Sequence, residues 1–375
     1  MWVIRSNSAS HTQSVEAKAL LQHNLTRKQH KRMPLPPRRL ILHVGMHKTG
    51  TKALQAYLAA NRLQLAQTGV HYPRAGRHRL EENLYTAGHH QIAFDLANDD
   101  RNASLVDVAK EIRLVQAATV VLSSEEFLPL AYRPGVLDAI IAMARELGYE
   151  PAAVIVLRAQ PDYLESIYSE IAKTSFASNF DDFIEQTTRD GHFTTPNYTF
   201  PFDLAYTAVV GRLEAIFGLG NVVARAYRRD RDLDFGHSDF LSVVAHMRGG
   251  LQLENARNPL PSTNERVTLL QLLANIVRTR GANFDVAAFV RERFPHFEEA
   301  ELGRPFFLMT RADRRRLLSR FALDNAAINT RFGIAIPFVS EADAAISDAD
   351  EARAHKHRAL LGAVLQATNY CLPVN

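Results

Sequence analysis

Five consecutive residues, Lys48 to Lys52, carry the clearest chemical signal in the sequence. They read Lys-Thr-Gly-Thr-Lys and follow an apolar run that ends at Gly45. Glycines at 45 and 50 let the backbone turn so that successive N–H groups converge at the start of a helix. Converging N–H groups, two hydroxyls and two ammonium groups are complementary to a phosphate. The segment therefore predicts an anion-binding loop at the N-terminus of a helix.

This loop differs from that of nucleoside triphosphatases, whose pattern is G-x-x-x-x-G-K-[ST]. Here Gly45-x4-Gly50 is followed by Thr51 and Lys52, so the hydroxyl residue and the lysine stand in the opposite order. The other lysine, Lys48, lies inside the loop. A P-loop kinase is therefore an alternative whose most diagnostic position does not match.

A second pair of polar residues, Arg158 and Ser166, follows a later apolar run. Arg158 ends the segment AAVIVL, and Ser166 comes eight residues afterwards. Pro161 is placed to open a helix between them. The apolar residues of that helix recur at i, i+3, i+4 and i+7, namely Leu164, Ile167, Tyr168 and Ile171. Ser166 falls outside this apolar stripe, so its hydroxyl can face a ligand.

Two residue types in the sequence could take a proton from an acceptor. Glu125 follows the apolar run 119–122 and two serines, and ligands of open α/β sheets bind at the carboxyl ends of strands. We expect Glu125 to be the base and the serines to hold its carboxylate. His89 and His90 are the competing candidates, and Glu126 is interpreted as a helix-start carboxylate.

The fold class follows from the order of the elements. Apolar runs rich in Val and Ile at 40–45, 119–122, 152–157 and 222–227 are typical of strands buried on both faces. Helical patterns separate them, which indicates an α/β fold with a parallel sheet flanked by helices. Residues 263–280 and 311–331 predict amphipathic helices, so we expect a helical C-terminal section packed on the sheet.

Taken together, these motifs resemble those of sulfotransferases that use 3′-phosphoadenosine 5′-phosphosulfate (PAPS). The family's 5′-phosphosulfate loop, close to P-K-[ST]-G-[ST]-[TS], reads here His47-Lys48-Thr49-Gly50-Thr51-Lys52. His47 replaces the proline and Lys52 replaces a hydroxyl residue. Arg158 and Ser166 match the family's arginine and serine that bind the cofactor's 3′-phosphate. The segment 206–227 and the pair Asn258 and Ser262 resemble the bacterial, polysaccharide-directed branch.

The resemblance, which covers roughly residues 38 to 340, implies an activity and a set of roles. The activity would be in-line transfer of a sulfuryl group from PAPS to a hydroxyl or amine, on a saccharide or another small molecule, with no metal required. Lys48 would stabilise the charge on the departing 5′-phosphate, and the residues from His47 to Lys52 would bind that phosphate. Arg158 and Ser166 would bind the 3′-phosphate.

Composition restricts the remaining classes of function. The chain has 375 residues, a single cysteine (Cys371) and no apolar run of 18 residues, so we expect no membrane span and a cytoplasmic location. Its net charge is +4, but residues 1–40 alone carry +7, which leaves −3 for the rest. No nucleic-acid partner is therefore expected for the domain. A non-enzymatic anion-binding or nucleic-acid-binding protein that uses the basic tail is a third hypothesis.

These observations divide the chain into three parts. Residues 1–37 form a basic tail without structure, 38–340 form the sulfotransferase-like α/β domain with a helical subregion from about 250, and 341–375 form a charged helical extension. The sequence leaves the oligomeric state and the identity of the acceptor open.

Overall fold

The computed structural model describes residues 37–81, 84–98, 103–174, 179–195, 198–227, 237–247, 267–336 and 346–369. The chain forms two compact units, Met1–Pro37 and Arg38–Asn375, and the second is the subject below. Pro37 apart, the predicted basic tail lies outside the described residues. Asn258, Ser262 and Cys371 lie outside them too.

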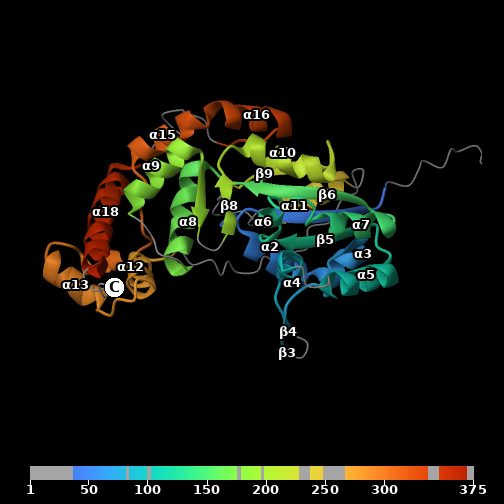
Figure 1. Ribbon diagram of the computed structural model, residues 1–375, viewed down its shortest axis with the longest axis horizontal. Coiled ribbons are helices and arrows are strands. Elements are labelled where there is room, and N and C mark those ends of the chain that lie inside the picture. The colour runs from blue at the N-terminus through green and yellow to red at the C-terminus, as the bar shows by residue number, and fades with distance from the viewer. Residues whose placement is uncertain are drawn as a thin grey trace, which may run out of the picture. The chain divides into compact units, whose positions relative to one another are not determined.

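A five-stranded parallel sheet forms the centre of the second unit, as the sequence predicts (Figure 1). Its order is β2-β5-β1-β6-β9, with bounds β2 Val70–His71, β5 Thr119–Ser124, β1 Arg39–Gly45, β6 Glu150–Leu157 and β9 Val222–Ala226. All four predicted strands are present. The short edge strand β2 is the addition.

The central strands are buried because their side chains are apolar on both faces. Every residue of β1 from Leu40 to Gly45 is buried, and so is every residue of β5. In register, Val44 pairs with Ser124 of β5, and Gly45 pairs with Val156 of β6. The carboxyl ends of β1, β5 and β6 therefore lie at one edge of the sheet, neighbouring strands being about 4.8 Å apart.

Helices cover both faces of the sheet. On one face, α2 (Thr51–Ala60), α3 (Arg62–Gln67) and α11 (His237–Met247) pack with Ile41 and Val121. The other face packs against a larger cluster that includes Leu40 and Leu42. The helices next to this face of the sheet are α4 His90–Ala97, α5 Ala103–Val115, α6 Phe127–Leu130, α7 Asp138–Glu146 and α10 Tyr206–Phe217. Among the described helices, none combines the length and apolar character needed to cross a bilayer.

The C-terminal section is helical, but most of it packs on helices beside the sheet rather than on the sheet. Its elements are α12 Leu269–Thr279, α13 Val286–Arg293, α14 Glu299–Leu302, α15 Arg311–Arg320, α16 Ala322–Phe332 and α18 Asp348–Asn369. Both α12 and α15 contact α8 (Gln160–Thr174), whereas α16 contacts α10 and β9. The predicted single helix 311–331 is thus two helices, which meet at Phe321.

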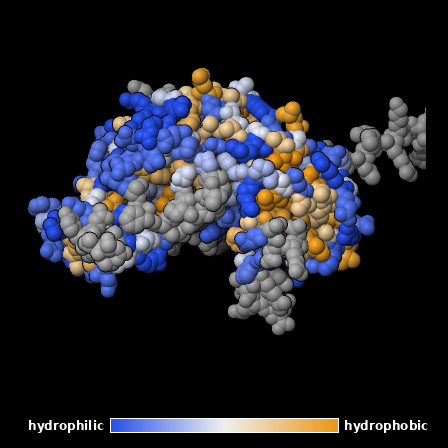
Figure 2. All heavy atoms as spheres, viewed as in Figure 1, coloured by the Kyte–Doolittle hydropathy of each residue, from blue (hydrophilic) through white to orange (hydrophobic). Residues whose placement is uncertain are grey.

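Smaller elements complete the unit. Helix α9 (Phe180–Asp190) precedes the hairpin β7–β8 (His192–Thr195 and Tyr198–Asp203), and a second hairpin joins β3 (Arg79–Glu81) to β4 (Leu84–Tyr85). Figure 2 shows a mostly hydrophilic surface over α9 and α15, whereas hydrophobic atoms gather over the part of the unit that contains the sheet. Arg315, Arg316 and Arg320 of α15 are exposed.

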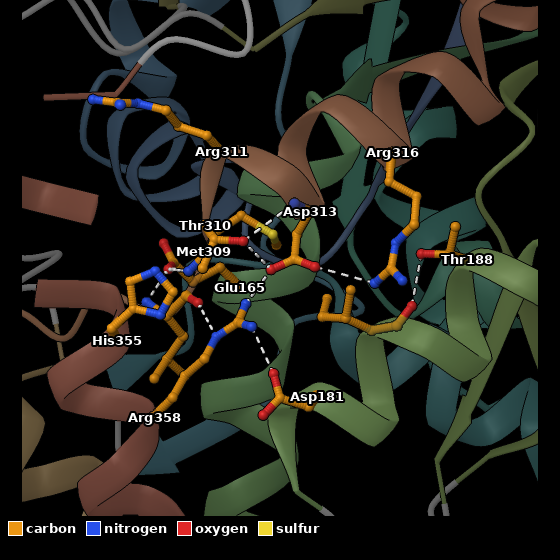
Figure 3. Close-up of polar contacts among 12 residues, drawn as sticks. Glu165, Asp181, Thr188, Met309, Thr310, Arg311, Asp313, Arg316, His355 and Arg358 are labelled. Carbon is orange, nitrogen blue, oxygen red and sulfur yellow. Dashed lines mark hydrogen bonds and ion pairs between the residues drawn. The ribbon is translucent and has the colours of Figure 1, made fainter. Parts of the chain in front are cut away.

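Polar contacts fix α8 and α9 to the C-terminal helices (Figure 3). The Glu165 carboxylate of α8 accepts hydrogen bonds from the backbone N–H groups of Leu308 and Met309, at 2.6 and 2.9 Å. Arg358 of α18 donates to Asp181 of α9 at 2.6 Å and also pairs with Asp313 of α15. Since α8 follows Arg158, these contacts fix the helix that carries one of the predicted motifs.

Candidate functional site

The two predicted motifs meet where the sheet changes its direction of winding. After β1 the chain builds β2 and β5 on one side, and after β6 it builds β9 on the other side. Open α/β sheets bind ligands at the carboxyl ends of the strands at such a point. The loop of residues 46–50 follows β1, and Arg158 follows the adjacent strand β6.

The loop after β1 has the backbone of an anion-binding turn. Lys48 and Gly50 both adopt the left-handed conformation, with φ of 64° and 79°, and a non-glycine residue rarely does so. The Thr49 hydroxyl donates to the carbonyl of Met46 at 2.6 Å and lies 3.5 Å from the Thr51 hydroxyl. Gly45 is required because a Cβ there would lie 2.5 Å from that hydroxyl oxygen.

The first turn of α2 supplies further donors. Among the described residues, no side chain caps this helix, and its N-cap position is Gly50. The first N–H groups of a helix lack partners within the helix and carry the positive end of its dipole. Together with the hydroxyl of Thr51, they form a set of donors that fits a phosphate or a sulfate, whereas the Thr49 hydroxyl donates its proton to Met46.

Arg158 packs directly on this loop. Its Nη1 donates to the carbonyl oxygen of Lys48 at 2.8 Å, and its guanidinium lies 5.3 Å from the centroid of the Tyr227 ring. Tyr206 donates its hydroxyl to the backbone carbonyl of Arg158. A Cβ on Gly50 would come within 3.2 Å of the Tyr227 ring. A guanidinium has five N–H donors, so Arg158 can bind an anion while keeping its bond to the loop.

Ser166 lies on the face of α8 that approaches the loop. It is half-buried and comes one helical turn before Glu170, so the two side chains share a face. Glu170 Oε2 lies 3.1 Å from Lys48 Nζ. The pKa of Lys48 is lowered, and burial is the largest cause. The carboxylate of Glu170 opposes this shift, whereas the positive charges of Lys173 and Lys52 add to it. Lys52 itself is exposed on α2.

The two competing candidate bases lie side by side at the end of β5. Glu125 Oε2 accepts a hydrogen bond from Gln55 Nε2 at 3.0 Å and lies 3.9 Å from His90 Nδ1. The same His90 nitrogen lies 2.8 Å from the Ser124 hydroxyl oxygen. The prediction that serines hold Glu125 is wrong, because Ser124 binds His90 and the hydroxyl of Ser123 binds the His43 ring.

Helix α2 connects the candidate bases to the loop of residues 46–50. Gln55 comes four residues after Thr51, so both lie on one face of α2 and both are buried. Glu125 directly follows Ser124, the strand partner of Val44, and the loop begins two residues after Val44. The structure therefore brings the loop, Arg158, Glu125 and His90 to one edge of the sheet.

Two neighbouring residues behave differently from the sequence expectation. His89 is fully buried: its Nδ1 accepts from the N–H of Ser123 at 3.1 Å, and its Nε2 lies 3.1 Å from the carbonyl of Pro73. Burial lowers its pKa to about 3, so His89 is a neutral structural residue. Glu126 is more than a helix-start carboxylate, because its Oε1 lies 3.6 Å from Nε2 of His47.

Three contacts of the site were not predicted from the sequence. Gln55 positions Glu125, Glu170 pairs with Lys48, and Tyr227 packs on Arg158. A partial signal existed for the first two, because each stands four residues after a predicted site residue, Thr51 or Ser166, on its helix. For Tyr227 the signal was its position as the last residue of the fourth predicted strand.

Comparison with known proteins gives one structural likeness. No protein-family model and no curated protein sequence matches this chain. Among solved structures, a chain described as a sulfotransferase from Alicyclobacillus acidocaldarius aligns with a TM-score of 0.37 and 14% sequence identity. The alignment covers 80% of this chain and 97% of that one.

Proposed function

We propose that this protein is a PAPS-dependent sulfotransferase that transfers a sulfuryl group to a hydroxyl or amine acceptor. The observation that carries the proposal is the packing of Arg158 on the Lys48 loop, with a bond of 2.8 Å between them. Two motifs that are 110 residues apart in the sequence thereby form one anion-binding region. The pair of Glu125 and His90 beside it supports a proton acceptor at the same edge.

The residues present fit the cofactor. Gly45 and Gly50 allow the close packing of the loop, because a Cβ would lie 2.5 Å from the Thr51 hydroxyl oxygen at Gly45 and 3.2 Å from the Tyr227 ring at Gly50. The residues from His47 to Lys52 would hold the 5′-phosphate. Arg158 and Ser166 would hold the 3′-phosphate, the first by charge-assisted hydrogen bonds. When bound, PAPS supplies an activated sulfuryl group with a nucleoside bisphosphate as its leaving group.

The chain's own residues would then act by positioning and by charge. Lys48 would stabilise negative charge next to the loop, which resembles the use of fixed cations in phosphoryl transfer. Glu125, held by Gln55, would accept the proton of the acceptor group. A saccharide acceptor is part of the proposal and rests on the resemblance of residues 206–227.

Calorimetry with adenosine 3′,5′-bisphosphate, AMP and ATP, each with and without Mg²⁺, tests the proposal. We expect the bisphosphate to bind roughly 10- to 150-fold more tightly than AMP, because a charge-assisted hydrogen bond contributes about 1.5–3 kcal/mol. Arg158→Lys should remove most of that difference, since a point charge does not replace a planar fork. The affinity of Arg158→Lys for AMP, which has no 3′-phosphate, should change less than its affinity for the bisphosphate.

Two results would contradict the assignment. Equal affinities for the bisphosphate and AMP would show that no 3′-phosphate site exists. Preferential binding of ATP with Mg²⁺ would favour the P-loop kinase. Among the described residues, no group of three or more His, Cys, Asp or Glu is placed to hold a metal ion. The measurements with and without Mg²⁺ test whether nucleotide binding depends on this ion.

A further inference from the structure

Glu170 is the residue that binds the ammonium group of Lys48. Its Oε2 lies 3.1 Å from Lys48 Nζ, and the two residues are 122 positions apart in the sequence. Both side chains are half-buried, with 27% of Lys48 and 38% of Glu170 exposed. The lysine that would act on a bound anion is therefore paired with a carboxylate of the chain itself.

The same carboxylate oxygen has a second cation. Lys173 Nζ also lies 3.1 Å from Glu170 Oε2, one turn further along α8. Because Glu170 and Lys173 are three residues apart on the same helix, Lys173 stays next to the carboxylate whether or not Lys48 does. If Lys48 turns to an anion in the loop, Glu170 is therefore not left as an unpaired charge.

The backbone of Lys48 is held in place by its conformation and by Arg158. Its backbone is left-handed, with φ of 64°, and its carbonyl oxygen is fixed by Arg158 at 2.8 Å. Since the backbone is held, the ammonium group can change partner only by rotation of the side chain. Its two possible partners are the Glu170 carboxylate and an anion bound at the N-terminus of α2.

We propose that Glu170 is a positioning residue that competes with the bound nucleotide for Lys48 and passes its charge pairing to Lys173 when the nucleotide binds. The inference rests on the proposed function, because it takes the nucleotide's phosphate to be the anion in the loop. It adds a role for Glu170 and Lys173, and it makes the availability of Lys48 depend on occupancy of the site.

A double-mutant cycle separates this competition from simple repulsion between Glu170 and the ligand. The affinity for adenosine 3′,5′-bisphosphate is measured by calorimetry for the wild type, Glu170→Gln, Lys48→Met and the double variant. We expect Glu170→Gln to tighten binding about two- to fivefold in the presence of Lys48, as for loss of a half-exposed ion pair. In the Lys48→Met background it should have no effect, whereas repulsion would act in both.

A conservative variant separates contact from charge. Glu170→Asp keeps the negative charge but shortens the side chain by one methylene, so it should lose the contact with Lys48 and bind the bisphosphate as tightly as Glu170→Gln does. Glu185→Gln on α9, an exposed carboxylate, is the matched control and should bind like the wild type.

Lys173→Met tests the role of the second lysine. This variant should bind the bisphosphate more weakly than the wild type, because Glu170 would then keep Lys48. Combined with Glu170→Gln, the same change should have no effect on the affinity.

The outcomes distinguish this inference from the proposed function. If the wild type binds the bisphosphate but Glu170→Gln has the same effect with and without Lys48, Glu170 does not act through Lys48 and the inference alone is overturned. The same holds if Glu170→Asp binds like the wild type. If the wild type binds the bisphosphate no better than AMP, both the inference and the proposed function are overturned.

Discussion

Glu125 and His90 lie 3.9 Å apart, Oε2 to Nδ1, and have different hydrogen-bond partners. Gln55 donates a hydrogen bond to the Glu125 carboxylate at 3.0 Å, which fixes the position of that carboxylate. His90 turns Nδ1 towards the Ser124 hydroxyl, at 2.8 Å, and towards Glu125, at 3.9 Å. This arrangement suits a carboxylate base that is positioned by an amide on one side and an imidazole on the other.

Glu125→Gln tests the assignment of the base, because it keeps the shape of the side chain and removes its basicity. We expect turnover to fall by about 10²–10⁴ while the affinity for adenosine 3′,5′-bisphosphate is retained. His90→Ala should reduce turnover less, as loss of a positioning contact. If His90→Ala abolishes transfer and Glu125→Gln leaves it intact, the histidine is the base. Glu126→Gln is the matched control and should act on nucleotide affinity, because Glu126 pairs with His47 of the loop.

At the scale of elements, α18 joins two helices that are far from it in the sequence. Arg358 binds Asp181 of α9 at 2.6 Å and pairs with Asp313 of α15, whose side chain is 11% exposed (Figure 3). It also donates to the carbonyl of Leu308 at 2.5 Å. By contrast, the pair of Arg316 with Asp313 lies within one helix, and the Arg316 side chain is 47% exposed.

This contrast predicts unequal effects of two arginine substitutions on stability. Arg358→Met removes the less exposed of the two arginines that pair with Asp313, although Arg316 and Thr310 still bind that carboxylate. The free energy of unfolding should therefore fall by about 1.5–3 kcal/mol, as for loss of a hydrogen bond to a charged group. Arg316→Met removes a half-exposed pair and should cost under about 1 kcal/mol. Urea denaturation of the two variants and the wild type measures both values. Equal losses would show that Arg358 does not hold α9, α15 and α18 together.

The elements also show which features the sequence could predict. The strands β1, β5, β6 and β9 were predictable because each is a continuous apolar run, whereas β2 has only two residues and no measurable period. The packing of α15 and α18 on α8 and α9 was not predictable, because it depends on pairs such as Arg358 and Asp181, which are 177 residues apart. The break at Phe321 between α15 and α16 has no glycine or proline to mark it.

The same distinction applies to the candidate site. The loop from His47 to Lys52 is contiguous in the sequence, and Arg158 follows a recognisable strand, so a pattern of residue types was enough to find both. Gln55, the partner of Glu125, and Glu170, the partner of Lys48, belong to no motif, although each stands four residues after a predicted site residue. Their roles arise only when α2 and α8 are placed next to β5 and the loop.

At the scale of the whole molecule, three of the described histidines, each almost fully buried, make stability depend on pH. His43 in β1, His89 before α4 and His357 in α18 are each at most 1% exposed. Burial lowers the pKa of His43 to about 4, that of His89 to about 3 and that of His357 to about 4. The folded state keeps all three neutral at pH values at which an unfolded chain, with a histidine pKa of about 6.5, binds protons.

The sign of the effect follows from this difference in bound protons. Below pH ~6.5 the unfolded state binds more protons than the folded state, so the free energy of unfolding falls as the pH decreases towards 4. Each histidine contributes a slope of about 1.4 kcal/mol per pH unit within that window. Glu165 acts in the opposite direction, because burial raises its pKa and the folded state then binds the extra proton. One carboxyl group cannot offset three imidazoles.

We therefore expect urea denaturation to give a steep loss of stability between pH 6.5 and 4.5, with the slope reduced in a histidine variant. His43→Gln should lower stability at neutral pH, since it disturbs the bond to Ser123, and should reduce the slope by about 1.4 kcal/mol per pH unit. His355→Gln is the control, because that side chain is 67% exposed and should leave the slope unchanged. A wild-type curve that is flat from pH 6.5 to 4.5, or equal slopes in His43→Gln and the wild type, would show that these imidazoles are charged within the fold.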